Sequence, residues 1–358
     1  MRAGTGVALA AAVLLALPGC AANEMGLPPA SANALSGTLN GSGASSQGSA
    51  SDAWIASFQL QNPDATINYS PDGSGAGRKA FISGGVQYAG SDSALSDAEL
   101  DGEFAGCAAG SKAIDLPVYI SPIAVIFNID GVSALNLDAA TIAGIFTGAI
   151  TAWDDPKIAA LNPDAALPSA TITAVHRSDD SGTTKNFTDY LGQVAPEAWD
   201  APPADTFPYQ KGEAAQGTSG VVEAVTNGVN TIGYADASRA GKLGIASIKV
   251  GEGFVKLSTK AAAAVVAESP LAPGREKHDI AVQLNRKTTD PGHYPLVLVS
   301  YMIACQTYPS SETAELVKAY IGHAASEAGQ AEAAKSAGSA PLSPELAAKI
   351  ADALDSIR

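Results

Sequence analysis

The sequence predicts an α/β protein, because strand-like and helix-like segments alternate through most of its 358 residues without a repeat of fixed period. Hydrophobic residues make up 46% of the chain and charged residues 16%, so the chain can bury a core and is too apolar to be disordered. A chain of this length favours two domains.

The expected elements follow from local patterns. A strand is predicted at residues 66–69, followed by a Gly-rich run and a helix at 78–86. The β-branched, apolar run at 116–129 predicts a long strand that passes between two sheets, interrupted by Ser121 and Pro122. The remaining segments are strands at 171–175, 231–234 and 294–304, helices at 137–146, 181–191, 220–226 and from 311 onward, a loop or frayed helix at 326–339, and a last helix capped by Ser343.

The N-terminus has the features of an export signal. An apolar run at residues 7–17 follows a basic residue and is too short to span a bilayer. It ends in Leu-Pro-Gly-Cys, which resembles the lipobox at which bacterial lipoproteins are cleaved and acylated. We therefore expect a signal peptide at 1–19, lipidation of Cys20, a tether at 20–34 and an extracytoplasmic protein anchored to the membrane. The alternative is a plain secretory signal with an incidental Cys.

Composition excludes several classes of function. The net charge of −15 leaves no basic face for nucleic acid. Three Cys and four His lack CxxC or HExxH spacing, so neither a metal site nor a cofactor is expected. Once the signal is removed, Cys107 and Cys305 remain as a pair in an oxidising compartment. They are either a structural disulfide or two buried thiols.

Three Gly/Ser segments point to an anion site. They lie at residues 41–46, 73–77 and 179–183, each just before an expected helix. Helix N-termini offer unpaired N–H groups and a positive dipole to oxyanions, although each segment alone is more typical of a structural turn. Arg177 lies just before the third segment, and its guanidinium can grip an oxyanion while Asp179 holds it in place.

Five segments, in order along most of the chain, occur together in one known family. They are residues 73–77, 90–92, 153–155, 176–183 and 232–234. Together they resemble the phosphate-binding protein of the bacterial Pst-type phosphate importer. The resemblance implies a type II periplasmic-binding-protein fold, in which two α/β domains joined by crossing hinge strands close over one phosphate. Domain I would comprise 35–117 and 294–358, and domain II 118–293.

The resemblance also implies a role for each site residue by position. Ser74 would donate a hydrogen bond to phosphate, and Asp92 would accept one from it. Arg177 would grip the ion, and Asp179 would hold Arg177 in place. The remaining donors, at a helix N-terminus, would be Ser181, Gly182 and Thr183. Ser45 and Ser46 stand where the family has Thr-Phe, so an aromatic wall is missing. Asp180 replaces a Gly and adds a negative charge near the anion.

Elementary chemistry supports a phosphate ligand. Phosphate near neutrality keeps a proton that a buried Asp92 can accept, whereas sulfate would leave that carboxylate without a donor. The alternative for Asp92 is a solvated turn residue. No Walker-type motif occurs, so any ATPase must be a separate subunit. The resemblance implies that the partners of a monomeric receptor are the membrane permease subunits of a phosphate importer.

Two other functions remain open at this stage. The chain could be a receptor for another oxyanion, because a fold alone does not fix its ligand. A secreted phosphoesterase with Ser181 as nucleophile is the other hypothesis, but no Gly-x-Ser-x-Gly elbow occurs and His176 should point away from its neighbour Arg177 on a strand. We therefore predict that the protein is not an enzyme. Trp153 and Tyr234 are expected to pack rather than bind ligand.

Overall fold

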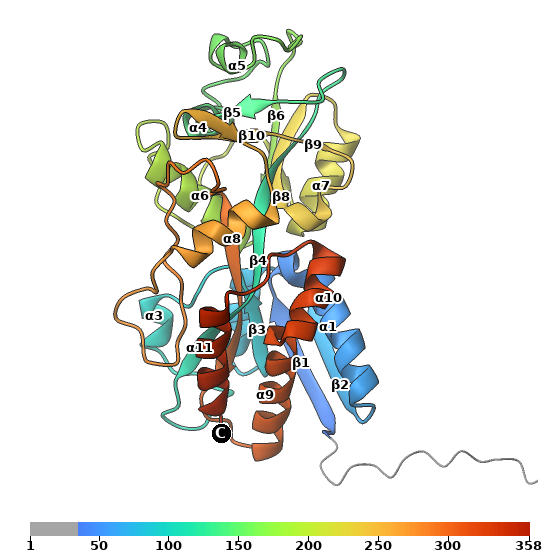
Figure 1. The fold of residues 1–358 in the computed structure, drawn as a ribbon, viewed down its shortest axis with the longest axis vertical. Helices are drawn as coiled ribbons and strands as arrows, with labels where there is room; N and C mark the ends of the chain where they lie inside the picture. The colour runs from blue at the N-terminus through green and yellow to red at the C-terminus, as the bar shows by residue number, and fades with distance from the viewer. Residues whose placement is uncertain (1–34) are drawn as a thin grey trace, which may run out of the picture. The chain divides into compact units, whose positions relative to one another are not determined.

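The structure, a computed structural model, describes residues 35–358. The predicted signal peptide, the lipidation site Cys20 and the tether lie outside these residues. One mixed sheet of nine strands runs through the described chain, which confirms the α/β class (Figure 1). Its strands, in spatial order, are β2 (Ala65–Ser70), β1 (Gly37–Gly43), β3 (Tyr88–Ser91), β12 (Val297–Cys305), β4 (Ala113–Asn128), β8 (Thr231–Asp236), β6 (Thr173–Arg177) and β7 (Glu213–Ala215), with β9 (Gly244–Ile245) beside β4.

Strand β4 is the long strand expected at 116–129, and it belongs to both ends of the sheet. Residues 113–122 pair with β12, and residues 123–128 pair with β8, both antiparallel. Pro122 has no N–H to give to a ladder, and it lies where the partner changes. We call β2, β1, β3, β12 and the first part of β4 the first sheet half, and the rest of β4 with β8, β6 and β7 the second sheet half.

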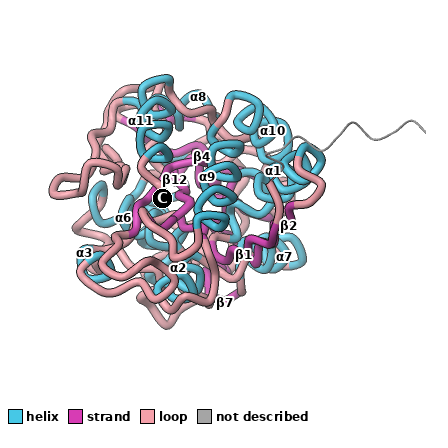
Figure 2. The backbone as a smooth tube through the Cα atoms, turned by 90° about the horizontal axis from the view of Figure 1, so that it is seen from below, coloured by secondary structure: helices cyan, strands magenta, loops and turns pink. Residues whose placement is uncertain are grey.

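Helices cover both faces of the sheet. Figure 2 shows α1, α9 and α10 on one side of β1 and α2 on the other. Around the first sheet half lie α1 (Gly48–Gln61), α2 (Ser74–Ile82), α3 (Asp97–Leu100), α9 (Ser311–Ala325), α10 (Glu327–Ala337) and α11 (Pro344–Asp355). Around the second lie α4 (Ala139–Thr147), α5 (Pro156–Leu161), α6 (Gly182–Val194), α7 (Gly217–Asn227), α8 (Thr259–Ala267) and a small sheet of β5 (Asn136–Leu137), β10 (Ser247–Val250) and β11 (Gly253–Val255). No helix of this part of the chain is both long and apolar enough to cross a membrane.

A disulfide joins Cys107 to Cys305, with their Cα atoms 5.5 Å apart. Cys305 is the last residue of β12, and Cys107 lies in the loop between α3 and β4. The bridge therefore confirms the disulfide interpretation of the two cysteines. It joins a strand of the first sheet half to the loop that leads into that half, so it does not link the two halves.

Helix α2 begins four residues earlier than the sequence predicted and ends at Ile82 instead of residue 86. The Gly-rich run therefore forms the first turn of the helix. Gly73, with a φ of 103°, precedes it in a conformation that favours glycine. A Cβ on Gly77 would lie 2.4 Å from the Cα of Gly43, so glycine lets α2 pack directly on β1.

Residues 326–339, expected as a loop or frayed helix, contain the regular helix α10, and that prediction is wrong. The indole of Trp54 donates to the carbonyl of Gly329 at 2.7 Å. The buried Gln330 amide donates to the carbonyls of Val118 and Ala324, both at 2.8 Å. The segment is rich in Ala, Glu, Gln and Lys, and the Ser326 hydroxyl caps it by accepting the Gly329 N–H at 3.1 Å, so local sequence favours this helix and the tertiary contacts stabilise it further.

The other expected elements are confirmed with small shifts. Asp138, Ser181 and Ser343 each accept an N–H of the first turn, at the starts of α4, α6 and α11. Strand β6 lies two residues later than predicted, and β12 begins only after Pro295. Of the two helix starts at the site, that of α6 is therefore where the sequence placed it, whereas that of α2 lies four residues earlier.

Candidate functional site

Asp92 lies at the centre of the site, directly after β3. Its side chain is buried, and its carboxylate accepts three hydroxyl hydrogen bonds. Ser46 and Ser300 donate to Oδ1 at 2.5 and 2.6 Å, and Thr183 donates to Oδ2 at 2.8 Å. Burial raises the pKa of Asp92, while these hydroxyls oppose the shift. The solvated turn that was the alternative for Asp92 is therefore excluded.

Two helix N-termini face this carboxylate. The Asp92 N–H donates to the Ser74 hydroxyl at 3.1 Å, at the start of α2. The Thr184 N–H donates to the Ser181 hydroxyl at 3.2 Å, at the start of α6. Because each serine oxygen accepts a backbone hydrogen, each serine keeps its own hydrogen for a ligand. Both helix dipoles also favour an anion here.

Arg177 and Asp179 form an oriented clamp at the end of β6. The Arg177 Nε donates to Asp179 Oδ1 at 2.7 Å, and Nη2 donates to Oδ2. The Gly217 N–H also donates to Oδ1, at 2.9 Å. Burial acts to raise the pKa of Asp179, but the Arg177 contacts hold it below its ordinary value. Within residues 35–358, Nη1 of Arg177 has no acceptor, so this edge of the guanidinium is available to an anion.

Gly182 shows how closely the two sheet halves meet. A Cβ at this position would lie 2.6 Å from the Ser74 hydroxyl and 2.8 Å from the Asp92 Cβ. Only glycine therefore lets α6 approach β3 and α2 this closely. The structure thus brings together eight of the nine predicted residues, which we call the Asp92 cluster: Ser46, Ser74, Asp92, Arg177, Asp179, Ser181, Gly182 and Thr183.

Ser45 lies at the edge of this cluster. Its hydroxyl accepts the Thr218 N–H at 3.1 Å and lies 2.9 Å from the Thr218 hydroxyl, at the start of α7. Among the described residues, no hydrogen bond joins Ser45 to Asp92. Ser45 instead links the first sheet half to a third helix N-terminus.

Asp180 does not leave an uncompensated charge beside the cluster. Its carboxylate accepts from Lys79 at 2.6 Å and from Thr206 at 2.7 Å. The hydrogen bond from Lys79 is the main reason that the pKa of Asp180 is lowered. The charge that the sequence adds at this position is therefore matched by a lysine of α2.

Sequence reasoning missed several supporting residues. Ser300 is one polar residue inside the apolar strand β12, and that contrast was the only available signal. Gln47, buried, follows the two predicted serines. Tyr234, expected only to pack, stacks on Phe187 with ring centroids 4.1 Å apart and also lies 2.7 Å from the Thr184 hydroxyl. Trp153 is buried in the core, as predicted.

The residues of the alternative hydrolase do not assemble. The His176 ring stacks on Phe207, with centroids 4.1 Å apart, and contacts the Arg177 carbonyl at 3.0 Å. No hydrogen bond in residues 35–358 joins His176 to Ser181. Nor does this part of the chain contain three His, Cys, Asp or Glu side chains arranged to hold a metal ion.

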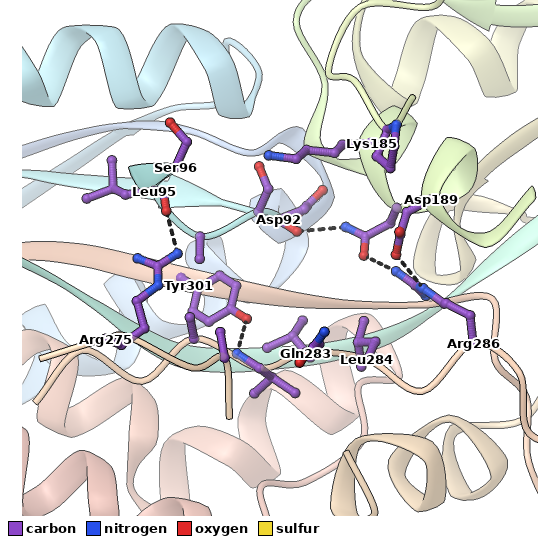
Figure 3. Close-up of a pocket in the computed structure, with 18 of the residues that line it drawn as sticks. Asp92, Leu95, Ser96, Lys185, Asp189, Arg275, Gln283, Leu284, Arg286 and Tyr301 are labelled. Carbon is purple, nitrogen blue, oxygen red and sulfur yellow. Dashed lines mark hydrogen bonds and ion pairs between the residues drawn. The ribbon is translucent and has the colours of Figure 1, made fainter. Parts of the chain in front are cut away.

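A cavity of about 480 Å³ adjoins Asp92 and is drawn in Figure 3, but no residue of the arginine clamp or of the α6 start lines it. Arg286 donates to Asp189 at 3.0 Å and to Asn186 at 2.5 Å. Asn186 in turn donates to the Asp92 carbonyl at 2.7 Å. These three hydrogen bonds hold the backbone of Asp92 against α6.

Comparisons with known proteins agree on one group. The profile of the PBP superfamily domain matches residues 28–328. The chain is 35% identical to the phosphate-binding protein PstS2 of Mycobacterium bovis (strain BCG / Pasteur 1173P2), over 99% of both chains. It is also 35% identical to phosphate-binding protein PstS 3 of Mycobacterium leprae, over 79% of this chain and 78% of that one. Among solved structures, a high-affinity periplasmic phosphate-binding protein (PfluDING) bound with phosphate matches with a TM-score of 0.72 and 23% identity, over 88% of this chain and 93% of that chain.

Proposed function

Because the chain belongs to the family of PstS phosphate-binding proteins and has their type II periplasmic-binding-protein fold, we propose that it binds one inorganic phosphate ion at the Asp92 cluster. The observation that carries this proposal is the buried Asp92 carboxylate among hydroxyl donors, beside the clamp of Arg177 and Asp179. All nine residues expected from the sequence, Ser45 included, are proposed to serve this ligand.

The proposed selectivity follows from proton count. Thr183 turns its hydroxyl from Asp92 to the ion, and Asp92 accepts the proton that phosphate keeps near neutrality. Ser74, Ser181 and the free edge of Arg177 donate to the other oxygens. Sulfate carries no proton, so its oxygen would face the carboxylate without a hydrogen between them, which is strongly unfavourable in a buried site.

Isothermal titration of the ligand-free protein tests the proposal. We expect tight one-to-one binding of phosphate and no binding of sulfate at matched ionic strength. Arg177→Lys keeps the charge but loses the two-pronged contact with Asp179, so it should weaken phosphate binding while the protein stays folded. Asp92→Asn should reduce the difference in affinity between phosphate and sulfate. A folded, ligand-free protein that binds no phosphate would refute the proposal, and other oxyanions and phosphoester turnover would then be assayed.

We further propose that binding acts in transport rather than catalysis. Domain I, residues 35–117 and 294–358, and domain II, residues 118–293, would close over phosphate about the β4 and β12 crossing. Two ion pairs between residues of the two domains support closure. Arg78 lies 2.7 Å from Asp205, and Lys79 lies 2.6 Å from Asp180. X-ray scattering with and without phosphate should show a more compact protein when phosphate is bound.

The expected partners are permease subunits and a separate ATPase subunit of a phosphate ABC importer, with the receptor a monomer on the outer face of the membrane. The tether and lipid at Cys20 would hold it there. Cys20→Ser should release the protein into the medium while leaving its phosphate affinity unchanged. Retention of this variant in the membrane fraction would contradict the anchor.

A further inference from the structure

Ser300 and Gln47 lie behind Asp92, outside the set of residues assigned by the sequence. Ser300 is fully buried on β12 at a register shift: Tyr301 pairs with Pro117 and Ser300 with Tyr119, which leaves one residue of β4 unpaired. Such β-bulges change the direction of nearby side chains and are frequent beside functional sites. Here the Ser300 hydroxyl lies 2.6 Å from Asp92 Oδ1.

The direction of this hydrogen bond is fixed by Gln47. The side-chain nitrogen of Gln47 lies 2.9 Å from the Tyr301 carbonyl and 2.7 Å from the Ser300 hydroxyl. A carbonyl can only accept, so the NH2 group of Gln47 must face it, and the second N–H hydrogen goes to Ser300. The Ser300 hydrogen is then left for Asp92.

Gln47 has one further property that packing does not explain. Its side-chain oxygen is buried and has no hydrogen-bond partner among the described residues. A buried carbonyl without a hydrogen-bond donor is unfavourable for folding. The role of the Gln47 amide is therefore the pair of hydrogen bonds that its nitrogen donates to Ser300 and to the Tyr301 carbonyl.

From this geometry we propose that Ser300 and Gln47 are positioning residues that hold Asp92 as a proton acceptor and thereby set the selectivity for protonated over unprotonated oxyanions. The inference rests on the proposed phosphate function. With Oδ1 occupied by two donors, Ser46 and Ser300, the ligand proton goes to Oδ2, which Thr183 vacates.

The charges around Asp92 agree with this role. Burial raises the pKa of Asp92, and among the effects that oppose it the Ser300 hydrogen bond is the largest, ahead of Ser46 and Thr183. The other titratable or charged groups that act on it are Arg177 on β6, Asp236 at the end of β8 and Tyr69 on β2. Removal of Ser300 should therefore let Asp92 take up a proton at higher pH and present a hydrogen to sulfate.

The test compares phosphate and sulfate affinity of Ser300→Ala and wild-type protein by titration at pH 5.5 and pH 8. We expect the preference for phosphate to fall about tenfold or more at pH 5.5 and to change less at pH 8. Ser300→Thr keeps the hydroxyl and should restore the wild-type preference. Ser51→Ala, which removes a buried hydroxyl that has no hydrogen-bond partner in the described chain, is the matched control and should leave the preference unchanged.

Gln47→Met provides a second variant should Ser300→Ala fail to fold, and it should shift the preference in the same direction by a smaller factor. Unchanged preference at both pH values in a variant that still binds phosphate would overturn the positioning role alone. A wild-type protein that binds no phosphate would overturn the proposed function and this role together.

Discussion

Asp205→Asn should weaken phosphate binding about tenfold. Asp205, in the loop between α6 and β7 beside the second sheet half, forms an ion pair with Arg78 of α2, which lies beside the first. Arg78 Nη2 donates to Asp205 Oδ2 at 2.7 Å, while Nε binds Glu99 at 2.9 Å and Nη1 binds Ser93 at 2.9 Å. The guanidinium is therefore held in place before Asp205 arrives. The substitution keeps the shape of the side chain and removes only its charge.

Burial sets the size of the effect. The Arg78 and Asp205 side chains are 7% and 17% exposed. Hydrogen bonds to charged groups contribute about 1.5–3 kcal/mol, and the Arg78 hydrogen bond keeps one charged partner after Asp205→Asn. Moving from the upper to the lower end of that range costs about 1.5 kcal/mol, which corresponds to about tenfold in the dissociation constant.

Asp180→Asn is the matched control, since it removes a charge from the second contact between the sheet halves. Lys79 and Asp180 are 73% and 37% exposed. An exposed ion pair contributes about 0.2–1 kcal/mol and is screened by salt, so affinity should fall less than about fivefold.

Isothermal titration gives the two affinities, and stopped-flow fluorescence should place most of the Asp205→Asn effect in faster phosphate release. Circular dichroism checks that both variants are folded. An Asp205→Asn protein that binds phosphate as tightly as wild type, or a larger loss in Asp180→Asn, would refute the argument from burial.

Three further predictions concern the fold and the site. Cys107→Ala with Cys305→Ala opens a loop with a sequence separation of 198, so the free energy of unfolding in urea should fall by up to about 5 kcal/mol while phosphate affinity is kept; an affinity loss as large as that of Arg177→Lys would contradict this. Gly182→Ala places a methyl group 2.6 Å from the Ser74 hydroxyl, and titration should show at least a tenfold loss of phosphate affinity. Burial raises the pKa of Asp236 to about 6, so the folded protein favours the protonated form of this carboxyl group. The stability that the protonated group contributes is present at low pH and is lost as pH rises through about 6. Asp236→Asn should therefore raise the free energy of unfolding by about 3 kcal/mol at pH 8 and by much less at pH 4, and an equal effect at both pH values would exclude this cause.

Local sequence identified the parts of the site that depend on local structure. The segments that contain Ser74 and Ser181 stood out because small and hydroxyl residues before a helix have a short-range signature, and the resemblance to the phosphate-binding family then gave each serine its role. The wrong assignment at α10 has another cause, because the local signal was present and was overlooked. Ala, Glu and Lys in this segment favour a helix and Ser326 caps it, but its Gly and Ser residues led to the prediction of a loop.

The missed residues depend on contacts that no local pattern contains. Ser300 reaches Asp92 only because β12 pairs beside β3 and has a register shift against β4. Lys79 compensates Asp180 from 101 positions away. A single sequence records neither the pairing of strands nor the partner of a charge.

The strand order has a consequence for the way the chain folds. Strand β12 is made last among the strands, yet it lies between β3 and β4, which are made early. The first sheet half is therefore incomplete until almost the whole chain has been synthesised, and folding cannot proceed from the N-terminus one piece at a time. Such long-range pairing slows folding and leaves strand edges exposed meanwhile, so a nascent chain of this topology depends on being shielded until its C-terminal part arrives.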